Sequence, residues 1–167
     1  VSYFLSAERG PAVASGGEGL SFSRLAAALS QLKPVPGRMQ VVRVEEEASD
    51  ISVVVDYAHT PDGLRSALLG LREHFSGELT CLFGAGGNRD VGKRPLMGEV
   101  AEHYADTVIL TDDNPRTGDG DAIIDQILWG FVRPEAVRKI RNREEAIGAV
   151  SDAGEPGAVI LIAGKGN

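Results

Sequence analysis

Short apolar segments alternate with longer amphipathic segments along most of this chain, from about residue 39 to its end. The short segments are rich in Val, Ile and Leu and predict buried strands at 39–44, 51–57, 78–84, 106–111, 137–140 and 157–163. The longer segments carry apolar residues at helical spacing and predict helices at 60–75, 94–105, 121–131 and 142–153. This alternation indicates an α/β fold with a Rossmann-like, mostly parallel sheet and helices on both faces.

The start of the chain has a different pattern. Residues 1–19 are rich in Gly, Ala and Ser without a sustained period, which is typical of a loop or of a fragment of a larger structure. Apolar residues at helical spacing predict a short helix over 20–32, and two prolines then end it. We therefore expect a linker after this helix and a domain that begins near Gly37.

Composition narrows the classes of partner. The 167 residues include 17 Lys and Arg against 24 Asp and Glu, a formal net charge of −7, which argues against binding to nucleic acid or to an anionic membrane. The single Cys excludes an internal disulfide. No apolar run approaches the roughly 18 residues of a spanning helix, and we see no secretory signal, so we expect a cytoplasmic location.

Four polar segments follow predicted strands at the same edge of the sheet. They are 56–62 (DYAHTPD), 84–90 (GAGGNRD), 111–117 (TDDNPRT) and 163–167 (AGKGN). The connections at the opposite edge carry ordinary turn residues. Ligands of open α/β sheets bind outside the carboxyl ends of the strands, so this distribution predicts a small-molecule site there.

The Gly-rich segment at 87–93 matches a phosphate-binding loop only in part. Arg94 stands where such a loop needs Ser or Thr for magnesium, and Arg89 replaces the third Gly of a dinucleotide fingerprint. A tight strand-to-helix turn and an anion site are both compatible with this segment. The positive charges of Arg89 and Lys93 favour the interpretation as an anion site.

The other two candidate segments also have alternative interpretations. Asn114 and Arg116 can bind a carboxylate, or they can belong to an Asx-type turn with a solvated Arg. Because the other polar loops are predicted at the same edge of the sheet, carboxylate binding is favoured. Asp56 can accept hydrogen bonds from a ribose with His59 against the base, or the segment can simply begin a helix at Thr60. No third ligand lies at a spacing that would make Asp56 and His59 a metal site.

Other reactive or aromatic residues are expected to be structural. Cys81 lies inside a predicted strand without an activating neighbour, so we expect it in the core. Trp129 and Phe131 end an apolar helix face and are also predicted to be core residues.

Five segments resemble the Mur ligase family in sequence and in order: VPGRM (35–39), DYAHTPDGL (56–64), FGAGGNRDVGKRPLM (83–97), TDDNPRT (111–117) and AGKG (163–166). The resemblance covers residues 20–167 and is strongest to members that add meso-diaminopimelate to UDP-N-acetylmuramoyl-L-Ala-D-Glu in peptidoglycan synthesis. It implies ATP-dependent amide ligation through an acyl phosphate, with ATP and Mg²⁺ as cofactors.

The resemblance also implies roles for individual residues. In the ATP site, Arg38 would reach the phosphates and Asp56 would hold the ribose, with His59 close by. The implied residues of the diaminopimelate site are Arg89, Asp113, Asn114, Arg116 and Gly164. The DNPR segment marks a preference for meso-diaminopimelate over lysine, because its Arg pairs with a second carboxylate that lysine lacks.

The chain departs from the family in two respects. It contains no intact P-loop, which the family carries in a central ATPase domain together with the magnesium ligands. It also has Asn167 in place of a His and stops before a Glu that helps to bind diaminopimelate. We therefore expect residues 1–36 to be the tail of the central domain and a linker, with 1–19 unassigned, and 37–167 to be the C-terminal domain, truncated at its end.

The consequence for activity is that no catalytic residue is assignable in this chain, and we expect it to be inactive as a ligase without the central domain. Its share would be acceptor binding and part of the ATP site, in partnership with that domain. Two alternatives stay open: a binding module for a dicarboxylic amino acid or a nucleotide, and a relative that adds lysine or glutamate. Arg116 counts against the second of these.

Overall fold

The computed structural model describes residues 21–31, 35–42, 51–87, 90–114, 116 and 118–164. The chain divides into two compact units, 1–34 and 35–167. In the first unit, helix α1 spans Phe22–Leu29, within the helix predicted over 20–32. No helix in the described part of the chain has the length and apolar character needed to cross a membrane.

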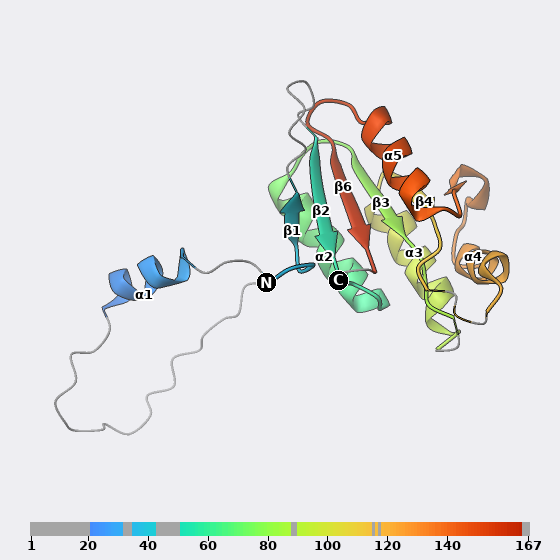
Figure 1. Ribbon diagram of the computed structural model, residues 1–167, viewed down its shortest axis with the longest axis horizontal. Helices are drawn as coiled ribbons and strands as arrows, with labels where there is room; N and C mark the ends of the chain where they lie inside the picture. The colour runs from blue at the N-terminus through green and yellow to red at the C-terminus, as the bar shows by residue number, and fades with distance from the viewer. Residues whose placement is uncertain are drawn as a thin grey trace. The chain divides into compact units, whose positions relative to one another are not determined.

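The second unit is built on one sheet, which has six strands among the described residues (Figure 1). The strands are β1 (Gln40–Val42), β2 (Ser52–Asp56), β3 (Leu79–Phe83), β4 (Thr107–Leu110), β5 (Arg138–Lys139) and β6 (Val159–Ala163), in the spatial order β1-β2-β6-β3-β4-β5. Only the edge pair of β1 and β2 is antiparallel; the other neighbours are parallel. The prediction of a mostly parallel sheet is confirmed.

Helices cover both faces of this sheet, as predicted (Figure 1). They are α2 (Pro61–His74), α3 (Lys93–Tyr104), α4 (Gly120–Leu128) and α5 (Arg143–Ala153), and a short 3₁₀ helix spans Pro134–Ala136. Apolar residues of α2, α3 and α4 pack with one set of strand residues, such as Phe83 and Leu161. Those of α5 pack with the set on the other face, such as Leu82 and Ile160. Consecutive strand residues pack on opposite faces of the sheet because side chains alternate in direction along a strand.

Side-chain caps fix where three of the helices begin. Thr60 Oγ1 accepts a hydrogen bond from the Gly63 amide at 3.1 Å, with Pro61 in the first helical position. Asp119 caps α4 and Asn142 caps α5 in the same way. Such caps satisfy backbone amides that have no partner inside the helix. They set these helix N-termini at the edge of the sheet where the parallel strands end.

Two expectations about the core have opposite outcomes. Cys81 is fully buried, and burial raises the pKa of its thiol to about 12, so its assignment to the core is confirmed. Trp129 is 73% exposed, and its assignment to the core is wrong. Helix α4 ends at Leu128, and Trp129 lies two positions after the buried Ile127, which turns it away from the core. Phe131 does pack against the core.

Candidate ligand site at the carboxyl edge of the sheet

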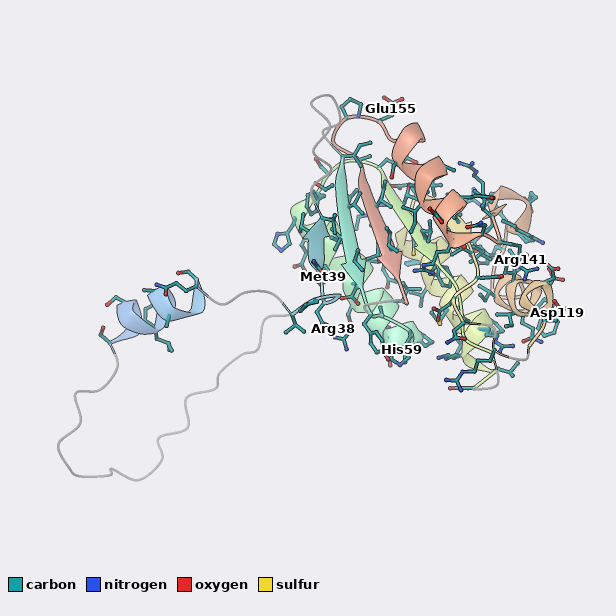
Figure 2. The ribbon with its side chains drawn as sticks, in the orientation of Figure 1. Arg38, Met39, His59, Asp119, Arg141 and Glu155 are labelled. Carbon is teal, nitrogen blue, oxygen red and sulfur yellow. The ribbon has the colours of Figure 1, made fainter. Side chains whose placement is uncertain are left out.

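The polar segments at the carboxyl ends of β2, β3, β4 and β6 are joined to one another by short contacts. In Figure 2, Arg38 and His59 lie at the end of the sheet to which β2 and β6 point, whereas Glu155 lies at the opposite end. Residues that are far apart in the sequence meet here because parallel strands end at the same edge.

Asp56, the last residue of β2, holds the turn that precedes β1. Its Oδ2 accepts a hydrogen bond from the Met39 amide at 2.8 Å, and its Oδ1 accepts one from the Ala58 amide at 2.8 Å. Met39 is in the left-handed region at φ 44°, a conformation that a non-glycine residue adopts only when its surroundings fix it. A carboxylate offers about four acceptor positions, so Asp56 can hold this turn and still accept a ligand hydroxyl.

Arg38, Tyr57 and His59 form a short stack beside Asp56. The Arg38 guanidinium carbon lies 4.2 Å from the centre of the Tyr57 ring, and that ring meets the His59 ring edge-on with 4.7 Å between centroids. His59 Nδ1 lies 3.0 Å from the carbonyl oxygen of Tyr57. The structure thus brings together the three predicted nucleotide residues and adds Tyr57, whose ring sits between two of them. Its position inside the DYAH segment is the signal that could have identified it.

Gly164, directly after β6, lies where the four polar segments meet. Its amide donates to the carbonyl oxygen of Asp56 at 3.1 Å. A Cβ atom at Gly164 would lie 3.8 Å from Asp113 Oδ2, 3.8 Å from the Gly84 oxygen and 3.9 Å from the Ala58 oxygen. Its φ of +95° is one that only glycine adopts without strain, which explains why the chain has glycine here.

The segment after β4 is joined to the Gly-rich segment after β3. The Asn114 carbonyl accepts from the Gly87 amide at 2.9 Å, and the Thr111 amide donates to Phe83 at 3.0 Å. A Cβ at Gly84 would lie 2.2 Å from the Thr111 oxygen, so the two segments approach closely only because residue 84 is glycine. Within the described part of the chain, the side chains of Asn114 and Arg116 are exposed and have no hydrogen-bond partner. Arg89 lies outside the described residues.

Arg141, next to β5, holds both ends of the loop that contains Asn114 and Arg116. It binds Asp112 through two hydrogen bonds, Nε to Oδ1 at 2.7 Å and Nη2 to Oδ2 at 2.9 Å. Its Nη1 pairs with Asp121 at 2.7 Å. These hydrogen bonds to Asp112 and Asp121 raise the pKa of Arg141. Figure 2 shows Arg141 beside Asp119 at the start of α4. Sequence reasoning missed this residue.

Lys93, at the end of the Gly-rich segment, and Arg94, directly after it, both bind groups of the protein itself. Arg94 is 4% exposed, donates from Nη2 to the Gly86 carbonyl at 2.9 Å, and binds Gln126 on α4 through Nη1. Arg94 therefore connects the Gly86 backbone to α4. Lys93, which the sequence favoured as an anion-binding residue, donates instead to the carbonyl oxygen of His59 at 2.8 Å. Among the described residues, no group of three or more His, Cys, Asp or Glu side chains could hold a metal ion.

The fold is an α/β domain with two adjoining clusters of polar groups at the carboxyl edge of its sheet. The family model described as Mur ligase, glutamate ligase domain, matches residues 37–166. The chain belongs to the Mur ligase family. It spans about three-tenths of the length of the curated relatives it matches.

Two of these relatives are described as UDP-N-acetylmuramoyl-L-alanyl-D-glutamate–2,6-diaminopimelate ligase. The protein of Xylella fastidiosa is 50% identical over 147 residues, which are 88% of this chain and 29% of that protein. The protein of Haemophilus ducreyi is 48% identical over 149 residues, which are 89% of this chain and 30% of that protein. The recognised family resemblance is confirmed.

Solved structures have the same fold. A structure of UDP-N-acetylmuramoyl-L-alanyl-D-glutamate–2,6-diaminopimelate ligase matches with a TM-score of 0.71 and 43% identity, over 86% of this chain and 29% of that one. A folylpolyglutamate synthase of Mycobacterium tuberculosis, solved with ADP and AMPPCP, matches with a TM-score of 0.65 and 23% identity, over 87% of this chain and 33% of that one. The second likeness shows the fold alone.

Proposed function

We propose that this chain is the C-terminal domain of an ATP-dependent ligase that adds meso-diaminopimelate to UDP-N-acetylmuramoyl-L-Ala-D-Glu in peptidoglycan synthesis. Its share is to bind the amino-acid acceptor and part of ATP. The proposal is supported by identities of 48–50% to ligases described with this activity. Because the reaction uses ATP and a UDP-linked substrate, we propose a cytoplasmic location.

The arrangement of two clusters at one edge carries the proposal. The first cluster, Arg38, Asp56 and His59, offers a cation, a carboxylate and aromatic surface, which suit phosphate, ribose and base. The second cluster, Asn114 and Arg116, offers an amide and a guanidinium that are exposed and lack hydrogen-bond partners in the described part of the chain. Gly164 adjoins both, through its amide at Asp56 and its closeness to Asp113.

The chemistry supplied by ATP is phosphorylation of the glutamyl carboxylate of the muramoyl dipeptide. The amine of diaminopimelate attacks the activated carbonyl carbon, an amide bond forms and phosphate leaves with the electron pair of the broken C–O bond. The residues described here perform no proton transfer in this proposal. They hold the amine acceptor and part of the nucleotide in place, which makes an otherwise bimolecular step effectively intramolecular. Mg²⁺ ligands belong to the central domain in this scheme.

Selectivity for meso-diaminopimelate is assigned to Arg116 with Asn114. Diaminopimelate carries a second carboxylate on the carbon that bears its second amine, where lysine carries only hydrogen. A guanidinium can bind that carboxylate through two parallel hydrogen bonds, so the site would leave Arg116 unpaired when lysine enters. Arg89, Asp113 and Gly164 complete the proposed acceptor site.

Amide NMR on the isotopically labelled chain tests the two halves separately. We expect meso-diaminopimelate to shift amides of the 84–87 and 111–116 segments, and ADP to shift amides near Arg38 and 56–59. Binding of ADP without meso-diaminopimelate would support a nucleotide-binding module instead. Shifts scattered over the surface, or no response to either compound from a folded chain, would contradict the proposed site.

A further inference from the structure

Arg143 lies behind the proposed acceptor site in an unfavourable setting for a cation. It is the first residue of α5, after the cap Asn142, so it sits at the positive end of the helix dipole. Its Nη2 donates to the carbonyl oxygen of Ala163 at 2.9 Å. Its Nη1 is buried without a hydrogen-bond partner among the described residues. Burial lowers the pKa of Arg143, and the nearby charge of Asp113 opposes that shift.

These features lower the stability of the fold. A guanidinium at the N-terminal end of a helix is disfavoured by the helix dipole, and a buried N–H without a partner costs the full desolvation of that group. An apolar or acidic side chain would suit this position better. Local rules are broken in this way mainly at functional sites, where an interaction beyond the fold compensates the cost.

The contacts of Arg143 lead to two parts of the proposed acceptor site. The carbonyl that it binds belongs to Ala163, the residue directly before Gly164. Asp113 also lies near Gly164, with its Oδ2 3.8 Å from the position of a Cβ there, and its charge acts on the Arg143 guanidinium. One guanidinium thus lies near the end of β6 and near a carboxylate that faces the same loop. Without that positive charge, Asp113 would oppose an acceptor that itself carries carboxylates.

We infer that Arg143 is a positioning residue of the acceptor site: it fixes the Ala163–Gly164 peptide and offsets the charge of Asp113, so that a dicarboxylic amino acid can bind beside Gly164. This inference rests on the proposed function. The assignment differs from that of Arg116, because Arg143 acts through protein groups and makes no contact with the ligand.

The test compares Arg143→Met and Arg143→Lys with the control Arg138→Met. The control removes an exposed arginine from β5, the strand that precedes α5 in the chain. Two quantities are measured by NMR: the hydrogen-exchange rate of the Gly164 amide in the free chain, and the affinity for meso-diaminopimelate. For Arg143→Met we expect faster Gly164 exchange and an affinity lower by about tenfold or more, as for loss of a charge-assisted hydrogen bond. Arg143→Lys should recover part of the affinity, and Arg138→Met should match the parent chain.

The outcomes separate this inference from the proposed function. If the parent chain does not bind meso-diaminopimelate, the proposed acceptor site is wrong, while Gly164 exchange still decides whether Arg143 fixes this peptide. Unchanged exchange and affinity in Arg143→Met would overturn the inference. So would faster exchange spread evenly over all strands, which marks a general loss of stability. If Arg143→Met does not fold, Arg143→Gln, which also removes the charge, decides: selective loss of Gly164 protection supports the inference, and a parent-like rate overturns it.

Discussion

The ammonium of Lys93 donates a 2.8 Å hydrogen bond to the carbonyl oxygen of His59, and this bond joins the two halves of the proposed site. Lys93 is the last residue of the Gly-rich segment and the first of α3, whereas His59 lies in the loop between β2 and α2. The bond therefore connects a loop assigned to the acceptor with a loop assigned to the nucleotide. A change at either loop is expected to reach the other through it.

Replacing Lys93 with Met tests this connection. We expect a loss of about 1 kcal/mol in the free energy of unfolding, the usual contribution of one hydrogen bond, and faster amide exchange across residues 58–60. Lys139→Met, which removes only a surface ion pair with Asp125, is the matched control. Equal exchange rates in the two variants across 58–60 would show that Lys93 does not hold this loop.

Gly164→Ala is predicted to destabilise the chain through backbone strain alone. A Cβ would meet nothing closer than 3.8 Å, but φ is +95°, which an alanine adopts only at a cost of about 1–3 kcal/mol. Gly148→Ala in α5 is the control, because a Cβ there meets nothing within 4 Å and alanine favours a helix by about 0.5–1 kcal/mol. Urea unfolding measures both; a neutral Gly164→Ala would contradict the positive φ.

Asp106 is predicted to contribute to acid sensitivity. Burial alone raises the pKa of the Asp106 carboxyl, but the Leu79 amide at 2.8 Å and the Arg72 guanidinium at 2.6 Å outweigh it and lower that pKa. The unfolded state then binds the proton more tightly, so this contribution is complete above the ordinary Asp value near 4 and disappears as the pH falls through the lower folded value.

The measurement is the free energy of unfolding as a function of pH for Asp106→Asn and the parent chain. The variant should be less stable at pH 7, and the difference should shrink towards pH 2. Asp62→Asn, at an exposed pair with Arg65, should change the curve much less. A difference that stays constant with pH would mean that the charge of Asp106 contributes nothing.

Cys81 is predicted to be unreactive in the folded chain. With no exposed surface and a pKa of about 12, only about one thiol in ten thousand is ionised at pH 8. A disulfide reagent should therefore modify it only after denaturant is added. Rapid labelling of the native chain would show that strand β3 opens far more readily than its burial implies.

The sequence predicted the parts of this structure that depend on local patterns. Apolar runs located β3 and β6, the Thr60–Pro61 pair located the start of α2, and Asp56 and His59 followed from their place at a strand end. The wrong assignment of Trp129 has a local cause too. Periodicity predicts which face of a helix is buried but not where the helix ends. Helix α4 ends at Leu128, just before Trp129. Gly130 then passes so close to α3 that a Cβ would lie 1.8 Å from the Pro95 oxygen.

Contacts between distant segments could not be predicted. Arg141 binds Asp112, 29 positions away, because β5 pairs with β4. No sequence motif predicts that pairing. The interaction of Lys93 with a carbonyl oxygen is a similar case, because the sequence favoured an anion as the partner of this lysine. Arg143 was missed because its setting depends on the end of β6, which the chain reaches 20 residues later.

We propose that Arg116 gives the site its preference for meso-diaminopimelate over L-lysine. The most direct test is the ratio of the two dissociation constants, measured by NMR titration for the parent chain, Arg116→Met and the control Arg138→Met. We predict that the parent and the control prefer meso-diaminopimelate, and that Arg116→Met lowers this preference by about 10- to 100-fold, as for loss of a bidentate charged pair. A parent chain that binds both amino acids equally, or a preference that survives in Arg116→Met, would contradict the claim.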